Sequence, residues 1–519
     1  MNGSVASKGK SSAKVEHFDV LIVGAGISGV GGAYHLKEQC PGKSFVVLEA
    51  LESFGGTWLM HTYPGVRSDS DLYTFGYRFK PWIGPPIATA GEILKYMGEV
   101  IEENDLGSHI RYQHKILKAS WSSKDNLWTI TAVRTDTNEE LTFTCNFLWM
   151  CQGYYRHAEG YTPEWEGMSD YKGLIIHPQT WPEDLDYKGK KVIVIGSGAT
   201  TATVVPAIAG DCEHVTVVQR SPTFFAPGFN RNDLADMLRD LDIDEMWIHE
   251  IVRRKILNDF KELTRRSFDE PEVLRKELLD GVRAYLPEDE VQKHFMPKYR
   301  PWQQRIAFVP EGDLFKGITA GKASVVTGDI DRFTEKGLKM KSGEEIEGDI
   351  IVTATGFNLS VLGDIDFNVD DKPLNFADTV TYHGMMFTGL PNLLWIFGYF
   401  RASWTLRADM LGDFVCRLLQ HMDAKGVGKV EVQLREEDQD MELLPWMDPA
   451  NFNPGYLMRS MHLLPKRGAK AEWQHTQDYW AEREVIPNID LDGEEFVYSG
   501  EKPQTEDAFA DTDLSRSAG

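Results

Sequence analysis

Two glycine-rich turns divide this chain into two similar units. The first turn reads GAGISG at 24–29 and follows an apolar run at 18–23; the second reads GSGATT at 196–201 and follows an apolar run at 192–195. A short buried strand, such a turn and then a helix form the unit that binds dinucleotides. We therefore expect an α/β fold with two Rossmann-like dinucleotide-binding domains.

The strands that follow the two turns end in opposite charges. The apolar run at 45–48 ends at Glu49, and the run at 215–219 ends at Arg220. A carboxylate at this place accepts hydrogen bonds from a ribose, whereas an arginine binds a 2′-phosphate. The pair of charges predicts one dinucleotide without that phosphate and one with it, and FAD with NADPH is the simplest combination.

Each turn also has a simpler interpretation. A glycine turn can arise by chance, and Arg220 can be an ordinary surface arginine. In the first turn, Gly26 would let the phosphate approach and Gly29 would let helix and strand pack, while backbone N–H groups hold the pyrophosphate. The second turn departs from the pattern, because Thr201 stands where glycine or alanine is usual. We favour nucleotide binding at both.

Composition restricts the class of protein. The 519 residues exceed one ordinary core and predict two or three domains, and the net charge of -24 argues against nucleic-acid binding. The five cysteines show neither a CxxC pair nor metal-ligand spacing, so we expect reduced thiols, no metal and a cytoplasmic location. The longest apolar stretch, 385–400, is too short to span a membrane, which leaves peripheral membrane contact open.

Changes in pattern along the chain predict its organisation. Leucine and isoleucine recur at helical spacing in 231–300, which we expect to be a helical insertion in the second nucleotide domain. The expected segments are a disordered N-terminus (1–14), an FAD-binding domain (15–160 and 360–490), an NADP-binding domain (161–230 and 301–359) and a mobile acidic tail (491–519).

A segment between the two turns carries a family resemblance. It reads YKGLIIHPQTWP at 171–182 and resembles the motif FxGxxxHxxxWP of the type I Baeyer–Villiger monooxygenases, with Tyr171 in place of phenylalanine. The matching motif positions are Gly173, His177, Trp181 and Pro182. Further shared runs are GGTW (55–58), YPGVRSDSD (63–71) and ASWTL (402–406), and they are most similar to the branch with the ethionamide-activating monooxygenases of mycobacteria.

The resemblance implies a reaction. In this family NADPH reduces the flavin, and one atom of O₂ is inserted beside the carbonyl of an apolar ketone to give an ester or lactone. Thioether oxidation is the expected side activity. Arg305 matches the cation that stabilises negative charge, and Asp69 matches its partner acid. A structural salt bridge for Arg305 and a loop cap for Asp69 are the simpler alternatives. We expect His177 to lie between the domains with fixed hydrogen bonds.

The resemblance also implies the cofactor contacts. For FAD they are Gly24, Gly26, Ser28, Gly29, Glu49, Thr57, Trp58, Leu59, Met60, Asp69 and Ile116. For NADPH they are Arg67, Ser68, Asp69, Gly196, Ser197, Gly198, Ala199, Thr200, Thr201, Ala202, Arg220 and Ser221. Gln304 replaces a lysine of many relatives, which predicts weaker discrimination against NADH. Trp404 lines the substrate pocket or belongs to the core.

Three other functions fit parts of the sequence. The main alternative is a flavin-containing monooxygenase that oxidises sulfur or nitrogen, against which Trp181, Arg305 and Asp69 count. A disulfide reductase would need a paired redox cysteine motif, which the chain lacks. A non-enzymatic FAD-binding module would consume no NADPH. Long-chain, cyclic and aryl ketones all stay open as substrates.

Overall fold

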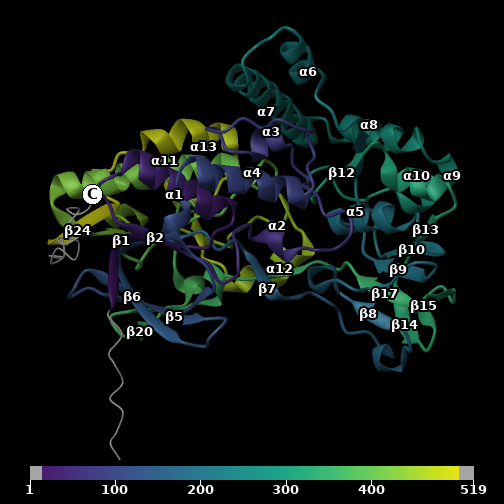
Figure 1. Ribbon diagram of the computed structural model, residues 1–519, viewed down its shortest axis with the longest axis horizontal. Coiled ribbons are helices and arrows are strands. Elements are labelled where there is room, and N and C mark those ends of the chain that lie inside the picture. The colour runs from purple at the N-terminus through teal and green to yellow at the C-terminus, as the bar shows by residue number, and fades with distance from the viewer. Residues whose placement is uncertain (1–14, 502–519) are drawn as a thin grey trace, which may run out of the picture.

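The computed structural model describes residues 15–501, which form two nucleotide-type lobes side by side (Figure 1). The segment expected to be disordered, 1–14, and the part of the expected tail from 502 onward lie outside the described residues.

The first lobe is built on a mixed sheet in the order β20-β19-β4-β5-β6-β1-β2-β3, with β23 beside β6. Its strands are β1 (Glu16–Val23), β2 (Phe45–Leu48), β3 (Ile110–Arg111), β4 (His114–Ser122), β5 (Leu127–Arg134), β6 (Glu140–Met150), β19 (Asp366–Val369), β20 (Lys372–Pro373) and β23 (Leu393–Trp395). Strands β1, β2, β3, β6 and β23 pair in parallel. The wholly buried run of β2 is typical of a parallel strand covered on both faces.

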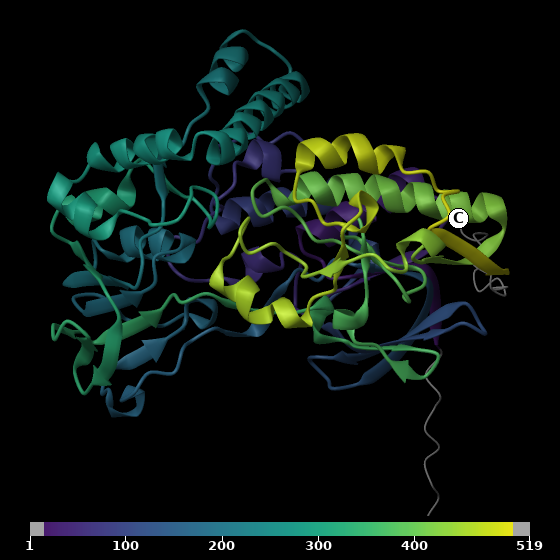
Figure 2. The same ribbon diagram turned by 180° about the vertical axis from the view of Figure 1, so that it is seen from behind.

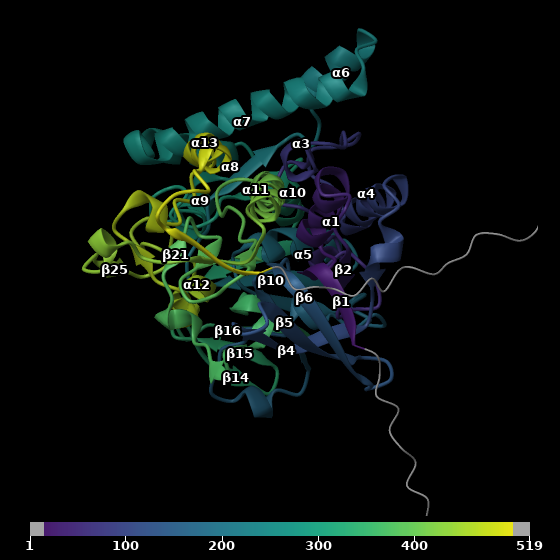
Figure 3. The same ribbon diagram turned by 90° about the vertical axis from the view of Figure 1, so that its left-hand side faces the viewer.

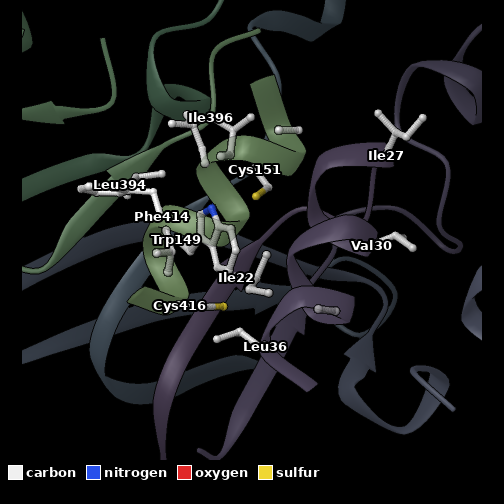
Figure 4. Close-up of a cluster of buried hydrophobic side chains, with 14 of the residues drawn as sticks. Ile22, Ile27, Val30, Leu36, Trp149, Cys151, Leu394, Ile396, Phe414 and Cys416 are labelled. Atoms are coloured by element: carbon white, nitrogen blue, oxygen red, sulfur yellow. The ribbon is translucent and has the colours of Figure 1, made fainter. Parts of the chain in front are cut away.

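Helices cover one face of this parallel core. They are α1 (Ile27–Gln39), α2 (Thr57–Met60), α3 (Leu72–Phe75), α4 (Ala90–Glu103) and α11 (Trp404–Lys425). Figure 4 shows α1 and α11 packed over the sheet, with Ile22, Trp149 and Phe414 between them. The helices approach closely, because a Cβ built on Gly412 of α11 would lie 2.5 Å from the His35 ring. This packing fixes the start of α11 beside the first turn.

The second lobe has a parallel sheet in the order β13-β10-β9-β17-β8. Its main elements are β8 (Leu174–Ile176), β9 (Lys191–Ile195), α5 (Ala199–Ile208), β10 (His214–Gln219), α10 (Asp313–Thr319), β13 (Ala323–Thr327) and β17 (Ile350–Thr353). A pair, β11 (Phe225–Gly228) with β12 (Ala307–Pro310), and a small sheet, β14 (Ile330–Thr334), β15 (Gly337–Met340) and β16 (Glu345–Glu347), extend it. The two parallel units confirm the expected fold class.

Four helices interrupt the second lobe. They are α6 (Asp233–Asp240), α7 (Glu245–Asp269), α8 (Pro271–Arg283) and α9 (Glu288–His294). Each of the first two begins at a residue whose side chain caps the helix, Asn232 for α6 and Asp244 for α7. Figure 3 shows α6 and α7 lying across the top of the molecule, clear of both sheets.

A two-stranded linker joins the lobes. It consists of β7 (Tyr155–Gly160) and β18 (Phe357–Leu359), which pair in antiparallel fashion. The apolar stretch 385–400 follows in the first lobe, where it forms β22 (Met386–Phe387) and β23. Within residues 15–501, no helix combines the length and apolar character needed to cross a membrane.

The C-terminal segments return to the first lobe (Figure 2). They comprise β21 (Thr381–Tyr382), β24 (Val427–Val432), β25 (Leu443–Leu444), α12 (Gly455–Ser460), β26 (Arg467–Gly468), α13 (Tyr479–Val485) and β27 (Phe496–Glu501). Strand β27 pairs with β24, so the expectation of a mobile tail is wrong for residues 496–501. The Phe496 side chain is buried and its ring meets that of Tyr382 at 5.2 Å, which outweighs the acidity of the segment.

Candidate functional site

The first glycine turn leaves no room for a side chain at its sixth position. Gly24 has a left-handed backbone (φ +95°), and a Cβ built on Gly29 would lie 1.8 Å from the carbonyl oxygen of Gly24. A Cβ on Gly56 would lie 3.2 Å from the Cα of Gly26, so the second glycine segment faces the first. Helix α1 begins directly after Gly26 without a side-chain cap, which leaves its first N–H groups for an anion.

Glu49 closes the other side of this turn. Its carboxylate is 6% exposed and accepts hydrogen bonds from the backbone N–H groups of Ala25 at 2.7 Å and Leu51 at 2.9 Å. Burial raises the pKa of Glu49, and these N–H donors offset part of that effect. Strand β4 starts beside Glu49, because His114 donates its backbone N–H to the Glu49 carbonyl at 2.7 Å. The buried Ile116 lies two residues further along this strand. These contacts fit an adenine ribose beside Glu49.

Trp404 lies at the first turn. Its Nε1–H donates to the Ser28 hydroxyl at 2.8 Å, and its ring stacks on Tyr154 with a centroid distance of 5.2 Å. Residues 57–60 form α2 immediately after the GG pair, and Trp58 packs against the core under α1. Of the expected FAD contacts, Ser28 of the first turn lies beside the start of α11.

The second turn is more open. Gly196 is left-handed (φ +137°), and its Cβ would lie 2.2 Å from the Ala354 carbonyl oxygen, whereas a Cβ on Gly198 would meet no atom within 4 Å. Helix α5 begins at Ala199 with its first N–H groups uncapped by a side chain. The Thr201 side chain is 2% exposed, and its hydroxyl has no hydrogen-bond partner among the described residues. This turn fits a phosphate that approaches at Gly198.

Arg220 stands exposed at the end of β10. In the described part of the chain, no carboxylate lies within 4 Å of its guanidinium. The Ser197 hydroxyl donates to the Ser221 carbonyl at 2.8 Å, which ties the strand end to the second turn. An unpaired arginine next to a phosphate-binding turn is the arrangement that binds a 2′-phosphate.

Arg67 joins the two lobes. Its guanidinium donates to the Asp313 carboxylate at 2.6 Å and to the Ala202 carbonyl at 3.1 Å. Next to it, a Cβ on Gly65 would lie 2.7 Å from Ala207 of α5, so this loop lies tightly against the second lobe. The buried Ser68 bonds the backbone of Ala88. Arg67, expected to contact NADPH, already has its charge balanced by Asp313.

Asp69 and Arg305 meet where the lobes join. Asp69 precedes α3, and Arg305 precedes β12. The guanidinium donates through Nε at 2.7 Å and through a terminal nitrogen at 2.9 Å, and each side chain is 35% exposed. Burial lowers the pKa of Arg305, but the Asp69 carboxylate together with the phenols of Tyr154, Tyr456 and Tyr155 raises it above its usual value, so the guanidinium stays charged. The structure thus holds a fixed cation with one forked partner.

Three tyrosines surround this cation, and the sequence analysis missed them. Tyr154 lies in the turn between β6 and β7, Tyr155 is the first residue of β7, and Tyr456 belongs to α12. The Arg305 charge acts on the pKa of all three phenols, which burial raises well above the usual value. A usable sequence signal existed for the first two, because ligands bind at the carboxyl ends of parallel strands. None marked Tyr456.

The motif at 171–182 binds the second lobe to the linker strands. A Cβ on Gly173 would lie 2.3 Å from the Tyr171 hydroxyl, which itself donates to the Gly348 carbonyl at 2.8 Å. His177 donates through Nε2 to the Gly356 carbonyl at 3.0 Å, and its Nδ1 accepts from the Gln179 N–H at 3.1 Å. Both ring nitrogens are therefore engaged, as in a structural histidine. Trp181 is buried in the core of the second lobe, and Pro182 follows it.

Comparisons with known proteins agree with this geometry. The chain matches the NAD(P)-binding Rossmann-like domain over 22–80 and the flavin-binding monooxygenase-like family over 84–262. It is 44% identical over 487 residues to the FAD-containing monooxygenase EthA of Mycolicibacterium smegmatis, covering 93% of this chain and 97% of that one. It is 40% identical to the probable FAD-binding monooxygenase AlmA of Acinetobacter baylyi, covering 92% and 95%.

Solved structures show the same fold. An oxidized steroid monooxygenase bound to NADP aligns with a TM-score of 0.73 at 22% identity and covers 93% of this chain and 100% of that one. The OTEMO complex with FAD and NADP aligns with a TM-score of 0.71 at 21% identity and covers 94% and 100%. The sequence relatives confirm the family expected from the motif: the chain belongs to the FAD-containing monooxygenases, in the branch that includes EthA.

Proposed function

We propose that this protein is a Baeyer–Villiger monooxygenase, which uses FAD, NADPH and O₂ to convert apolar ketones to esters or lactones and oxidises thioethers as a side reaction. The forked Arg305–Asp69 ion pair at the junction of the two lobes is the observation that supports this most. A permanent cation at that place suits an oxygen transfer in which negative charge builds up.

The two lobes divide the cofactors between them in this proposal. The lobe of 15–160 and 360–490 binds FAD through the first turn, with Glu49 at the ribose. The lobe of 161–230 and 301–359 binds NADPH through the second turn, with Arg220 at the 2′-phosphate. The close fit of the first turn, the open space at Gly198 and the unpaired guanidinium support this assignment.

The bound flavin, once reduced by NADPH, would supply one oxygen atom from O₂ to the substrate. The protein supplies position and charge. Arg305 keeps its positive charge and stabilises negative charge on the reacting oxygens, and Asp69 holds the guanidinium plane in one orientation. The bonded ring of His177 maintains the contact between the lobes rather than moving a proton.

An aromatic surface suits an apolar substrate. The Tyr154 ring contacts Phe397 at 5.1 Å and Trp404 at 5.2 Å, and the Tyr155 ring contacts Phe357 at 4.5 Å.

A cytoplasmic location is part of the proposal, because all five cysteines are buried and free of disulfides.

Aerobic NADPH consumption tests the proposal. Purified enzyme with bound FAD is incubated with a panel of ketones and thioethers, and the products are analysed by mass for one added oxygen. We expect esters or lactones from ketones. Sulfoxides or N-oxides without any ester would instead establish the heteroatom-oxidising alternative.

A further inference from the structure

Three phenol side chains form a cluster within electrostatic range of Arg305. The Tyr154 hydroxyl donates to the Tyr155 hydroxyl at 2.7 Å, and the Tyr456 ring meets the Tyr155 ring edge-on at 5.8 Å. All three side chains are half-buried. Phenylalanine would give the same apolar surface, so the hydroxyls need a separate explanation.

The cluster extends from the cation to the first glycine turn. On one side, the charges of both Arg305 and Asp69 act on the Tyr155 phenol. On the other side, Tyr154 stacks on Trp404, whose Nε1–H bonds Ser28. The cluster therefore lies between the residues assigned to oxygen transfer and those assigned to FAD.

Hydrogen-bond direction singles out Tyr155. Its oxygen accepts from Tyr154 and its own O–H lies next to the Tyr456 hydroxyl, so in this structure it donates within the cluster and has to turn to donate to a ligand. Burial keeps the phenols protonated, so they serve as donors and not as bases. The ring of Tyr155 is held by Phe357 at 4.5 Å, which fixes where the hydroxyl points.

We propose that Tyr155 is a further catalytic residue, whose hydroxyl donates a hydrogen bond to the carbonyl oxygen of the ketone. This bond would hold the carbonyl beside Arg305 and stabilise the negative charge that its oxygen gains as the carbonyl carbon is attacked. Tyr154 is a positioning residue, because it orients the Tyr155 hydroxyl. The inference rests on the proposed ketone oxidation and adds the group that recognises the substrate oxygen.

A thioether offers a matched comparison, because it has no carbonyl oxygen to accept this bond. Acetophenone and thioanisole share the phenyl ring and a methyl group. In the holoenzyme, Tyr155→Phe should lower ester formation from acetophenone by about 100-fold, the effect of one oxyanion donor. Sulfoxide formation from thioanisole should stay at the wild-type rate. Tyr154→Phe should show the same preference with a smaller effect.

Binding without turnover gives a second readout. Acetophenone is titrated into the oxidised holoenzyme with NADP⁺ and without NADPH, and the absorption change of the flavin is followed. Tyr155→Phe should weaken acetophenone binding about fivefold, as expected for one neutral hydrogen bond, and leave thioanisole binding unchanged. Tyr498→Phe is the control, because its hydroxyl bonds the Leu491 carbonyl at 2.7 Å, in the β27 region.

The outcomes separate the two proposals. A wild-type enzyme that forms sulfoxides but no ester overturns the proposed function, while the binding titration still tests the hydrogen bond. Equal losses for acetophenone and thioanisole in Tyr155→Phe, or unchanged acetophenone conversion and binding, overturn the role of Tyr155.

Discussion

The two glycine turns of this protein share the strand–turn–helix arrangement, but they differ in how closely the helix packs against the turn. In the first, helix α1 lies so close that a Cβ on Gly29 would overlap the carbonyl oxygen of Gly24 at 1.8 Å. In the second, the corresponding residue is Thr201, whose side chain is accommodated and fully buried. A sixth-position glycine is therefore required by packing in one lobe and is dispensable in the other.

The strand ends differ in the same sense. Glu49 is buried and already bonded to two backbone N–H groups, whereas Arg220 is exposed. An enclosed site with a prearranged acceptor suits a cofactor that stays bound, and an open site with a free cation suits one that must enter and leave in every cycle. The difference supports the proposed assignment of the flavin to the first lobe and of the exchanging nicotinamide nucleotide to the second.

The largest expected effect comes from Gly29→Ala. The added Cβ cannot be placed without moving α1, so the variant should lose bound flavin completely. The flavin absorption of the purified protein measures this. Gly198→Ala, at the third position of the second turn, is the control for an added methyl group and should keep the flavin, because its Cβ meets nothing within 4 Å. Equal flavin content in both variants would remove the contrast between the turns.

A selective effect is expected at Arg220. Arg220→Ala should raise the KM for NADPH by about 10- to 100-fold, the value of hydrogen bonds to a charged phosphate, and leave the KM for NADH unchanged. Steady-state kinetics with both nucleotides measure the ratio, and Arg220→Lys should lie between the two. If the KM values for NADH and NADPH rise together, the arginine does not bind the 2′-phosphate.

The smallest effect is expected at Thr201. Thr201→Val keeps the shape and removes a buried hydroxyl that has no partner in the described residues, so it should raise the free energy of unfolding by about 1 kcal/mol. Urea denaturation followed by fluorescence measures the change. Destabilisation would show that the hydroxyl is hydrogen-bonded, and that the sixth position of the second turn tolerates substitution as poorly as that of the first.

Local patterns predicted the fold better than they predicted the contacts. The turns, the strands after them and the helical insertion follow from periodicity, and the insertion helices lie between 233 and 294. The ends of the chain were harder. Acidity suggested a mobile tail from residue 491, but the apolar run Phe496 to Tyr498 lies in β27, which pairs with β24.

Contacts between distant segments could not be derived from spacing. The pairing of Arg305 with Asp69 was available only through the family resemblance, since 236 positions separate the two residues. Arg67 was expected at NADPH, yet Asp313 of the other lobe binds its guanidinium. The tyrosine cluster joins the start of β7 to α12, and no local pattern links these elements.

The most direct test of the central claim is ester formation by Arg305→Ala, measured on the purified holoenzyme together with its flavin content. The account predicts that the variant keeps its FAD and still accepts electrons from NADPH without oxygen, while ester formation from ketones falls by about 100-fold or more. Ester formation at the wild-type rate in a variant with full flavin content would contradict it.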